Sequence, residues 1–173
     1  MATWRRVSEE VLYSDRAIVL VDDFTVTELK RLAAETHRRR MRLCAHPDPD
    51  ASVHNMIIVH GRDAYVRPHR HPIKAESLHV IEGFAHALLF DGNGRINEIV
   101  ALGPAGAGRH FFYRMPPGHF HTLIITSDWF VFSETTEGPF IPDASEFPVW
   151  APVDGSAESA AYCAALRAAI TAK

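Results

Sequence analysis

Histidines dominate the part of this sequence that could do chemistry. The chain holds 11 of them, and all except His37 lie between residues 46 and 121. Histidine is the commonest metal ligand in proteins and the acid/base group whose pKa lies nearest neutral pH. Their concentration in one stretch of chain therefore indicates a metal site, a proton-transfer site, or both.

Two short motifs in this stretch place metal ligands at a regular spacing. The first is H-x-H-x4-E-x6-G, formed by His69, His71, Glu76 and Gly83. Two histidines separated by one residue on a strand point to the same face, so this pair faces one side. Four further residues let the chain turn, and Glu76 can return opposite the pair. The glycine then permits a tight turn into the next strand.

The second motif is P-x-G-x2-H, in which the turn at 116–118 starts a strand that carries His121. Together His69, His71, Glu76 and His121 supply three imidazoles and one carboxylate. Such a ligand set accepts Fe, Mn, Ni, Zn or Cu. Four protein ligands leave one or two coordination positions open, which is typical of a reactive site. The sequence therefore predicts one divalent transition metal, without fixing its identity.

Residues just before the first motif are candidates for substrate binding. By strand parity, Tyr65 and Arg67 point inward together with the first two histidine ligands. An inward arginine needs an anionic partner, because burying it alone costs free energy. Arg67 is therefore expected either to clamp a carboxylate or phosphate of a substrate, or to form an internal salt bridge with Glu134 or Glu137. The sequence leaves both alternatives open.

A proton-transfer group is expected near the second motif. His119 has the parity of His121, so it either lines the pocket as an acid/base group or lies exposed in the turn. His79 has the opposite parity to Glu76 and is expected to face outward. The catalytic candidates are therefore His119 and, after it, Tyr65.

Short strands are the elements expected to position these residues. Many short strands separated by turn residues are typical of an antiparallel sandwich or barrel, and eight strands suit a jelly roll. The sequence predicts strands at 53–60, 64–71, 77–81, 85–90, 96–102, 110–115, 122–126 and 129–134.

The N-terminal part differs in pattern from this strand-rich region. The apolar run at 17–21 could form a strand, and residues 25–28 form a capping-box pattern. Apolar residues then recur at helical spacing, so we expect a helix over about 26–40.

The C-terminal part is expected to wrap the barrel and end in a helix. An alanine-rich stretch after residue 155 predicts a helix that packs through Tyr162, Leu166 and Ile170. The predicted division of the chain is an N-terminal helical or mixed cap (1–50), a barrel (51–136), a proline-rich wrap (137–155) and a C-terminal helix (156–173).

Both motifs resemble the two motifs of the cupin superfamily, and longer stretches are similar to the WbuC-type cupin metalloproteins. That resemblance implies a mainly β fold, the cupin double-stranded β-helix or jelly-roll barrel, and a chain that can pair into a homodimer. It also places His46 and His54 near the barrel mouth. The family is associated with bacterial lipopolysaccharide O-antigen gene clusters. The stretches that carry the resemblance are 65–72, 88–91, 115–118, 121–122, 137–139 and 150–152.

Composition argues against several other classes of protein. The net charge is −3, with 18 basic and 21 acidic residues, whereas a nucleic-acid binder is usually basic. No apolar run approaches the roughly 20 residues needed to span a bilayer. The first residues carry charges and no apolar core of a signal peptide. We therefore expect a cytoplasmic protein whose partner is a small molecule, and neither a nucleic acid nor a membrane.

These observations predict a metal-dependent enzyme that acts on a small polar, anionic substrate. The substrate expected from the resemblance is a sugar or nucleotide-sugar intermediate of bacterial surface polysaccharide metabolism. The metal would act as a Lewis acid in an isomerase- or epimerase-like reaction, or iron would support a dioxygenase reaction. A non-catalytic, metal-bound sugar-binding or sensor module is the alternative, because cupins host many functions.

Overall fold

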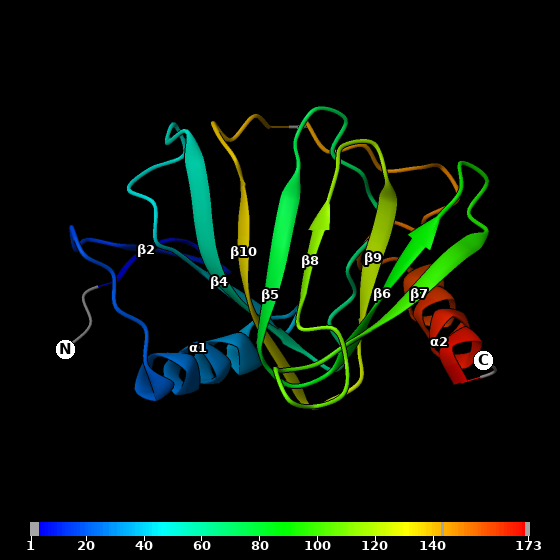
Figure 1. Cartoon of the computed structure of the whole chain (residues 1–173), viewed down its shortest axis with the longest axis horizontal. Coiled ribbons are helices and arrows are strands. Elements are labelled where there is room, and N and C mark those ends of the chain that lie inside the picture. The colour runs from blue at the N-terminus through cyan, green and yellow to red at the C-terminus, as the bar shows by residue number, and fades with distance from the viewer. Residues whose placement is uncertain (1–3, 143, 172–173) are drawn as a thin grey trace.

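Two β-sheets face each other and carry a helix on the outside of each, in a computed structural model that describes residues 4–142 and 144–171 (Figure 1). The strands are β1 (Trp4–Ser8), β2 (Val11–Ser14), β3 (Arg40–Cys44), β4 (Val53–Gly61), β5 (Glu76–Glu82), β6 (Ala85–Phe90), β7 (Ile96–Leu102), β8 (Phe112–Met115), β9 (Phe120–Ile125) and β10 (Trp129–Glu137). Within the described residues, the larger sheet has the order β1-β2-β3-β4-β10-β5-β8 and the smaller one the order β7-β6-β9.

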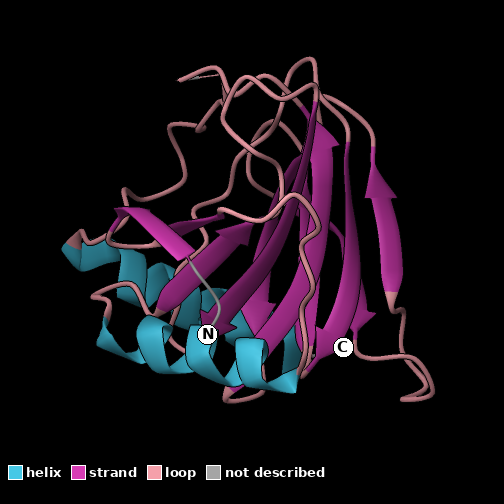
Figure 2. Cartoon of the chain, turned by 90° about the vertical axis from the view of Figure 1, so that its left-hand side faces the viewer, coloured by secondary structure: helices cyan, strands magenta, loops and turns pink. Residues whose placement is uncertain are grey.

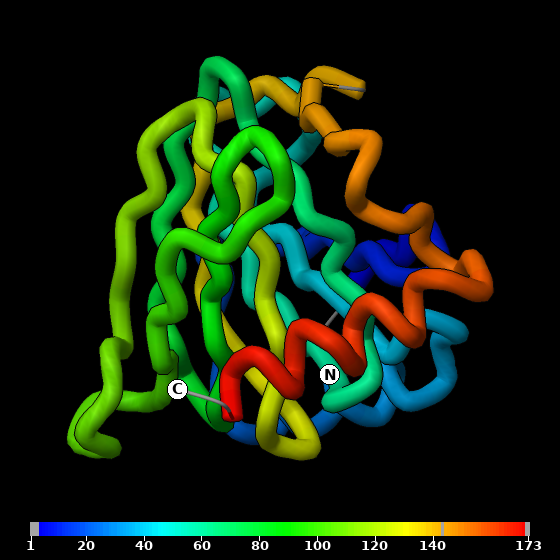
Figure 3. Tube along the Cα trace, turned by 90° about the vertical axis from the view of Figure 1, so that its right-hand side faces the viewer, coloured from blue at the N-terminus to red at the C-terminus, as the bar shows by residue number. Residues whose placement is uncertain are grey.

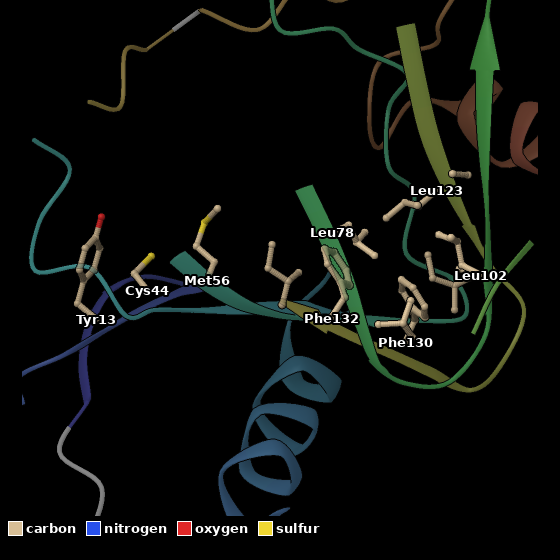
Figure 4. Packing of buried hydrophobic residues seen from close by; sticks show 13 residues of the cluster. Tyr13, Cys44, Met56, Leu78, Leu102, Leu123, Phe130 and Phe132 are labelled. Carbon is tan, nitrogen blue, oxygen red and sulfur yellow. The ribbon is translucent and has the colours of Figure 1, made fainter. Parts of the chain in front are cut away.

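The main core lies between the two sheets. Successive strand residues point to opposite faces of a sheet, so a row of partners across β4, β10 and β5 shares the inner face. Ile58, Phe132 and Val80 form such a row, and all three are buried. Figure 4 shows Cys44, Met56 and Phe132 on this face of the larger sheet, while α1 (Asp23–Glu35) lies on the other side.

The helix α1 starts and ends earlier than the predicted 26–40. Asp22 is its N-cap, and the side-chain carboxylate accepts a hydrogen bond of 2.9 Å from the backbone N–H of Thr25. A carboxylate is a strong N-cap, so the helix begins here and not at the capping-box pattern that starts with Thr25. Residues 40–44 form β3, which pairs with β4. The helix therefore ends before this strand begins. The helix covers the outer face of the larger sheet through Leu29 and Ala33.

The expected strand at 17–21 does not form. Ile18 and Leu20 are 74% and 71% exposed, and the strand of this region is β2, which precedes them. An apolar run alone does not make a strand, because a strand needs a neighbour with which its backbone can pair.

The C-terminal helix is present as predicted. It is α2 (Ala157–Thr171), and it lies beside the smaller sheet (Figure 3). Leu166 is buried against Leu88 and Ile124, with Tyr162 and Ile170 packed around it. Both helices lie toward one end of the sheets, and most of the connecting loops gather at the other end (Figure 2). Neither helix in the described part of the chain is long and apolar enough to cross a membrane.

Candidate metal centre

Three histidines converge on the inner side of β9. His121 lies on β9, and His69 forms an isolated antiparallel bridge with it through two backbone hydrogen bonds of 3.1 and 2.9 Å. His71 lies two residues further along the same segment. One ring nitrogen from each of the three side chains lies within 4.8 Å of the other two. The structure thus brings together the three imidazoles that the two sequence motifs contributed.

The segment before His69 is not the strand predicted at 64–71. Only His69 and Arg70 form bridges, to His121 and Glu146 respectively, and residues 64–68 run without regular pairing. Strand parity therefore does not extend back to Tyr65. Its hydroxyl donates a hydrogen bond of 3.0 Å to the carbonyl oxygen of Pro152, in the proline-rich segment.

Hydrogen bonds at the Nδ1 atoms of His69 and His121 fix which nitrogen of those two rings can bind a cation. His69 Nδ1 donates to the carbonyl oxygen of Arg67, and His121 Nδ1 donates to that of His119, both at 2.9 Å. A carbonyl oxygen can only accept, so Nδ1 carries the hydrogen and Nε2 keeps its lone pair. His71 Nδ1 lies 3.1 Å from Ser145 Oγ. Such outer contacts are the usual way in which metal-binding histidines are oriented.

The fourth expected ligand, Glu76, stands at the start of β5 and is 6% exposed. Its Oε1 lies 3.1 Å from His121 Nε2, and its Oε2 lies 3.3 Å from His71 Nε2. A carboxylate oxygen and an imidazole lone pair repel each other at this distance, so either a proton or a metal ion must lie between them. The four side chains therefore fit a divalent ion, because their free electron pairs point at one another within a buried space.

The pKa values of these side chains also indicate that the cluster binds a positive charge. Burial alone would raise the pKa of Glu76, but hydrogen bonds with His121 and His71 outweigh it and lower the pKa. Burial would lower the pKa of His121, but Glu76 outweighs it and raises the pKa. His69 has its pKa lowered to about 4 by burial and by the charge on His121. A proton between His121 and Glu76 thus takes the place that a metal ion would fill.

A cavity of about 450 Å³ extends from these four side chains into the space between the sheets. This volume lies in the range of small-molecule sites. Its other lining residues come from β3, β4, β8 and β10, from the chain just before His69 and from the proline-rich segment after β10. They include Arg42, Arg67, Tyr113, Glu134, Phe140 and Phe147.

Arg67 lines this cavity without the internal salt bridge that the sequence left open. Its Nε donates a hydrogen bond of 3.2 Å to the carbonyl oxygen of Ala151, and its guanidinium lies 4.8 Å from the ring centre of Phe147. In the part of the chain that the structure describes, neither Glu134 nor Glu137 pairs with it. Its remaining guanidinium hydrogens are thus available to a ligand.

Glu134 is a residue of this cavity that the sequence analysis considered only as a partner for Arg67. It lies on β10 opposite Leu78 and Met56, two buried residues of the inner face. Burial and then the nearby charge of Glu76 raise its pKa to about 7. The parity of Glu134 with the inward Phe132 was the sequence signal that could have identified it.

The two catalytic candidates, His119 and Tyr65, lie outside the described lining of the cavity. His119 is exposed in the turn before β9, where its Nδ1 lies 3.1 Å from the carbonyl oxygen of Pro117. His119 instead supports the site through its own carbonyl oxygen, which holds the ring of His121. His79 faces outward against Phe111, as parity predicted.

His46 and His54 lie close together near the cavity. Their rings stack with centres 4.0 Å apart and 3° between the planes, and His54 lines the cavity wall. Both side chains are buried, and neither lies within the cluster of three histidines.

Comparisons with known proteins agree with this fold. Residues 21–102 match a family model described as a domain of unknown function (DUF6016). No curated protein matches the sequence. The protein SO0799 from Shewanella oneidensis is 12% identical, with a TM-score of 0.50 over 61% of this chain and 72% of that chain. This likeness shows the fold alone. The fold itself is mainly β, with two facing sheets and a C-terminal helix, as the sequence predicted.

Oxalate decarboxylase from Bacillus subtilis is also similar in structure. One such structure, at pH 4.6, is 18% identical, with a TM-score of 0.48 over 62% of this chain and 27% of that chain. Another, from a study of the Mn(II) centres of that enzyme, is 19% identical, with a TM-score of 0.44 over 57% of this chain and 24% of that chain. The match therefore spans only about a quarter of the oxalate decarboxylase chain.

Proposed function

We propose that this protein is a metal-dependent enzyme that acts on a small polar, anionic substrate. The ligands are His69, His71, Glu76 and His121. The observation that carries the proposal is the convergence of three histidine ring nitrogens within 4.8 Å of one another, with Glu76 Oε1 3.1 Å from His121 Nε2, beside a cavity with room for a small molecule. A site that only stabilised the fold would need no such cavity.

Each role follows from the position of a side chain in the cavity. When bound, a divalent ion supplies Lewis-acid polarisation of a substrate carbonyl or hydroxyl. Arg67 binds an anionic group of the substrate, with its plane held by Phe147. Glu134 accepts and returns a proton, because a carboxyl whose pKa is raised to about 7 can do both near neutral pH. We assign this role to Glu134 and not to His119 or Tyr65, because Glu134 lines the cavity and the other two do not.

These roles favour isomerisation or epimerisation of a sugar or nucleotide sugar. Phe147, which is 50% exposed at the cavity wall, offers a flat apolar surface for a sugar ring. The resemblance to WbuC-type cupins supports a place in bacterial surface polysaccharide metabolism. An iron-dependent dioxygenase is the second candidate, because three imidazoles and one carboxylate also bind iron.

The test is to incubate the metal-loaded protein with nucleotide sugars and sugar phosphates and to follow their conversion by NMR. Glu134→Gln should retain metal and substrate binding but lose turnover, since the amide cannot accept the proton. Oxygen-dependent products would favour the dioxygenase. Saturable binding with no conversion would show a sugar-binding module and overturn the enzyme proposal.

A further inference from the structure

Arg42 lines the same cavity as the metal cluster, but from the opposite corner of the larger sheet. It lies on β3, and its row on the inner face runs through Ile58 and Phe132 to Val80 on β5. Glu76 is four residues before Val80 on that strand. Three strand spacings of about 4.8 Å and four residues of about 3.4 Å put roughly 14 Å in each direction between Arg42 and Glu76.

The guanidinium of Arg42 has no acidic partner within salt-bridge distance in the described part of the chain. The guanidinium does contact the sulfur of Met56, a weak acceptor, at 3.9 Å from Nη1. Neighbouring arginines are paired differently. Glu10 accepts from Arg38 at 2.5 Å and from Arg40 at 2.8 Å, so both of its carboxylate oxygens are already engaged.

An unpaired guanidinium in this position is unfavourable until an anion arrives. Arg42 is half-buried, and the residues beside it on the inner face, Met56 and Ile58, are buried and apolar. Low local polarity weakens screening, so a charge here attracts an anion more strongly than a surface charge does. The planar fork of arginine matches a carboxylate or a phosphate with two parallel hydrogen bonds.

We propose that Arg42 forms an anion subsite at the end of the cavity remote from the metal cluster, and that the ligand is an elongated small molecule with a terminal carboxylate or phosphate. This inference rests on the proposed function for its other end, where the metal and Arg67 bind the reacting part. Arg42, which lies on β3 in the N-terminal part of the chain, thus determines specificity for the anionic end of the ligand.

Calorimetric titration of the metal-loaded protein with glucose, glucose 6-phosphate and glucuronate tests the subsite. We expect a charged probe to bind more tightly than glucose and its Kd to rise about tenfold in Arg42→Gln, as loss of a charge-assisted pair predicts. Arg114→Gln, which changes an exposed arginine on β8, is the matched control and should bind like the wild type. The better charged probe identifies the anionic group.

Arg42→Lys gives a second test that keeps the charge but removes the fork, and its Kd should lie between those of the wild type and Arg42→Gln. Equal binding of glucose and both charged probes, or an unchanged Kd in both Arg42 variants, would overturn the proposal. A parallel metal titration separates the two claims. Arg42→Gln should bind metal as the wild type does. If the protein binds no metal but still binds the anion through Arg42, the proposed metal-dependent function is refuted and the anion subsite stands.

Discussion

Ser145 Oγ lies 3.1 Å from His71 Nδ1 and so connects the proline-rich segment to the metal centre. The next residue, Glu146, forms an ion pair of 2.6 Å and two backbone hydrogen bonds with Arg70. Phe147 then packs under the guanidinium of Arg67. Three successive residues of the segment thus hold the stretch of chain that carries two metal ligands, and two of them, Ser145 and Phe147, also line the cavity.

Ser145→Ala should weaken metal binding about tenfold without unfolding the protein. The change removes the contact that orients the ring of His71, and outer contacts of this kind are worth about 10- to 100-fold in affinity. Isothermal titration with a divalent metal measures the effect, and Ser52→Ala, at an exposed serine, is the control. An unchanged Kd in Ser145→Ala would show that His71 is positioned by other contacts.

Metal affinity should fall as the pH is lowered. The pKa of His121 is raised by Glu76, so below that pKa a proton occupies Nε2 and must leave when metal binds. Log Kd should rise by about one unit for each pH unit below the His121 pKa and level off above it. Titrations in buffers of different ionisation enthalpy would report the released proton. A Kd independent of pH would contradict the assignment of His121 as a ligand.

Protein stability should also fall in acid because of His60. Burial, followed by the charges of Arg40 and Arg42, lowers the pKa of His60 to about 3. A lowered histidine pKa means that the unfolded chain binds the proton more readily, so this contribution is complete above about pH 6.5 and is lost toward pH 3. The free energy of unfolding should drop by about 2 kcal/mol between pH 7 and pH 5.

His60→Leu should reduce this drop, whereas His79→Leu, at an exposed histidine, should leave it intact. Urea unfolding at several pH values measures both. The same drop in all three proteins would assign the acid sensitivity to other groups.

The sequence predicted those parts of the site that depend on local spacing. The ligand pair His69 and His71 needs only the two-residue period of an extended chain, and Gly83 was expected at a tight turn, where it indeed has φ of +81°. Glu134 and Arg42 were not identified as cavity residues. Parity with Phe132 could have placed Glu134 on the inner face of its strand. The position of Glu134 beside the metal ligands, and that of Arg42 in the same cavity, depend on how β3, β4, β10 and β5 align, and register between distant strands is not visible in one sequence.

Tyr65 was assigned to the pocket by strand parity, but the segment that holds it is not a strand. Prolines at 68 and 72 flank the ligand pair, and the preceding residues follow the proline-rich segment instead of a sheet neighbour. The start of α1 was misplaced for a different, local reason: Asp22 is the N-cap, and its carboxylate prevails over the capping-box pattern that begins at Thr25.

Gly83→Ala should destabilise the protein by about 3 kcal/mol or more. A Cβ at this position would lie 2.0 Å from the carbonyl oxygen of Trp129, in addition to the strain of a positive φ. Gly106→Ala is the matched control, because Gly106 has φ of +84° and a Cβ added there would meet no atom within 4 Å. It should lose only about 1 kcal/mol. Equal losses in denaturant unfolding would show that the turn after β5 relaxes around the new methyl group.

The metal centre itself is tested most directly by the metal content of His121→Ala. Wild-type protein and the variant are purified without chelator, dialysed with the same divalent metals and analysed by mass spectrometry of the elements, with His79→Ala as the control at an exposed histidine. We predict one divalent ion per chain in the wild type and in His79→Ala, and its loss in His121→Ala. Equal metal content in all three proteins would contradict the assignment of His69, His71, Glu76 and His121 as the ligands.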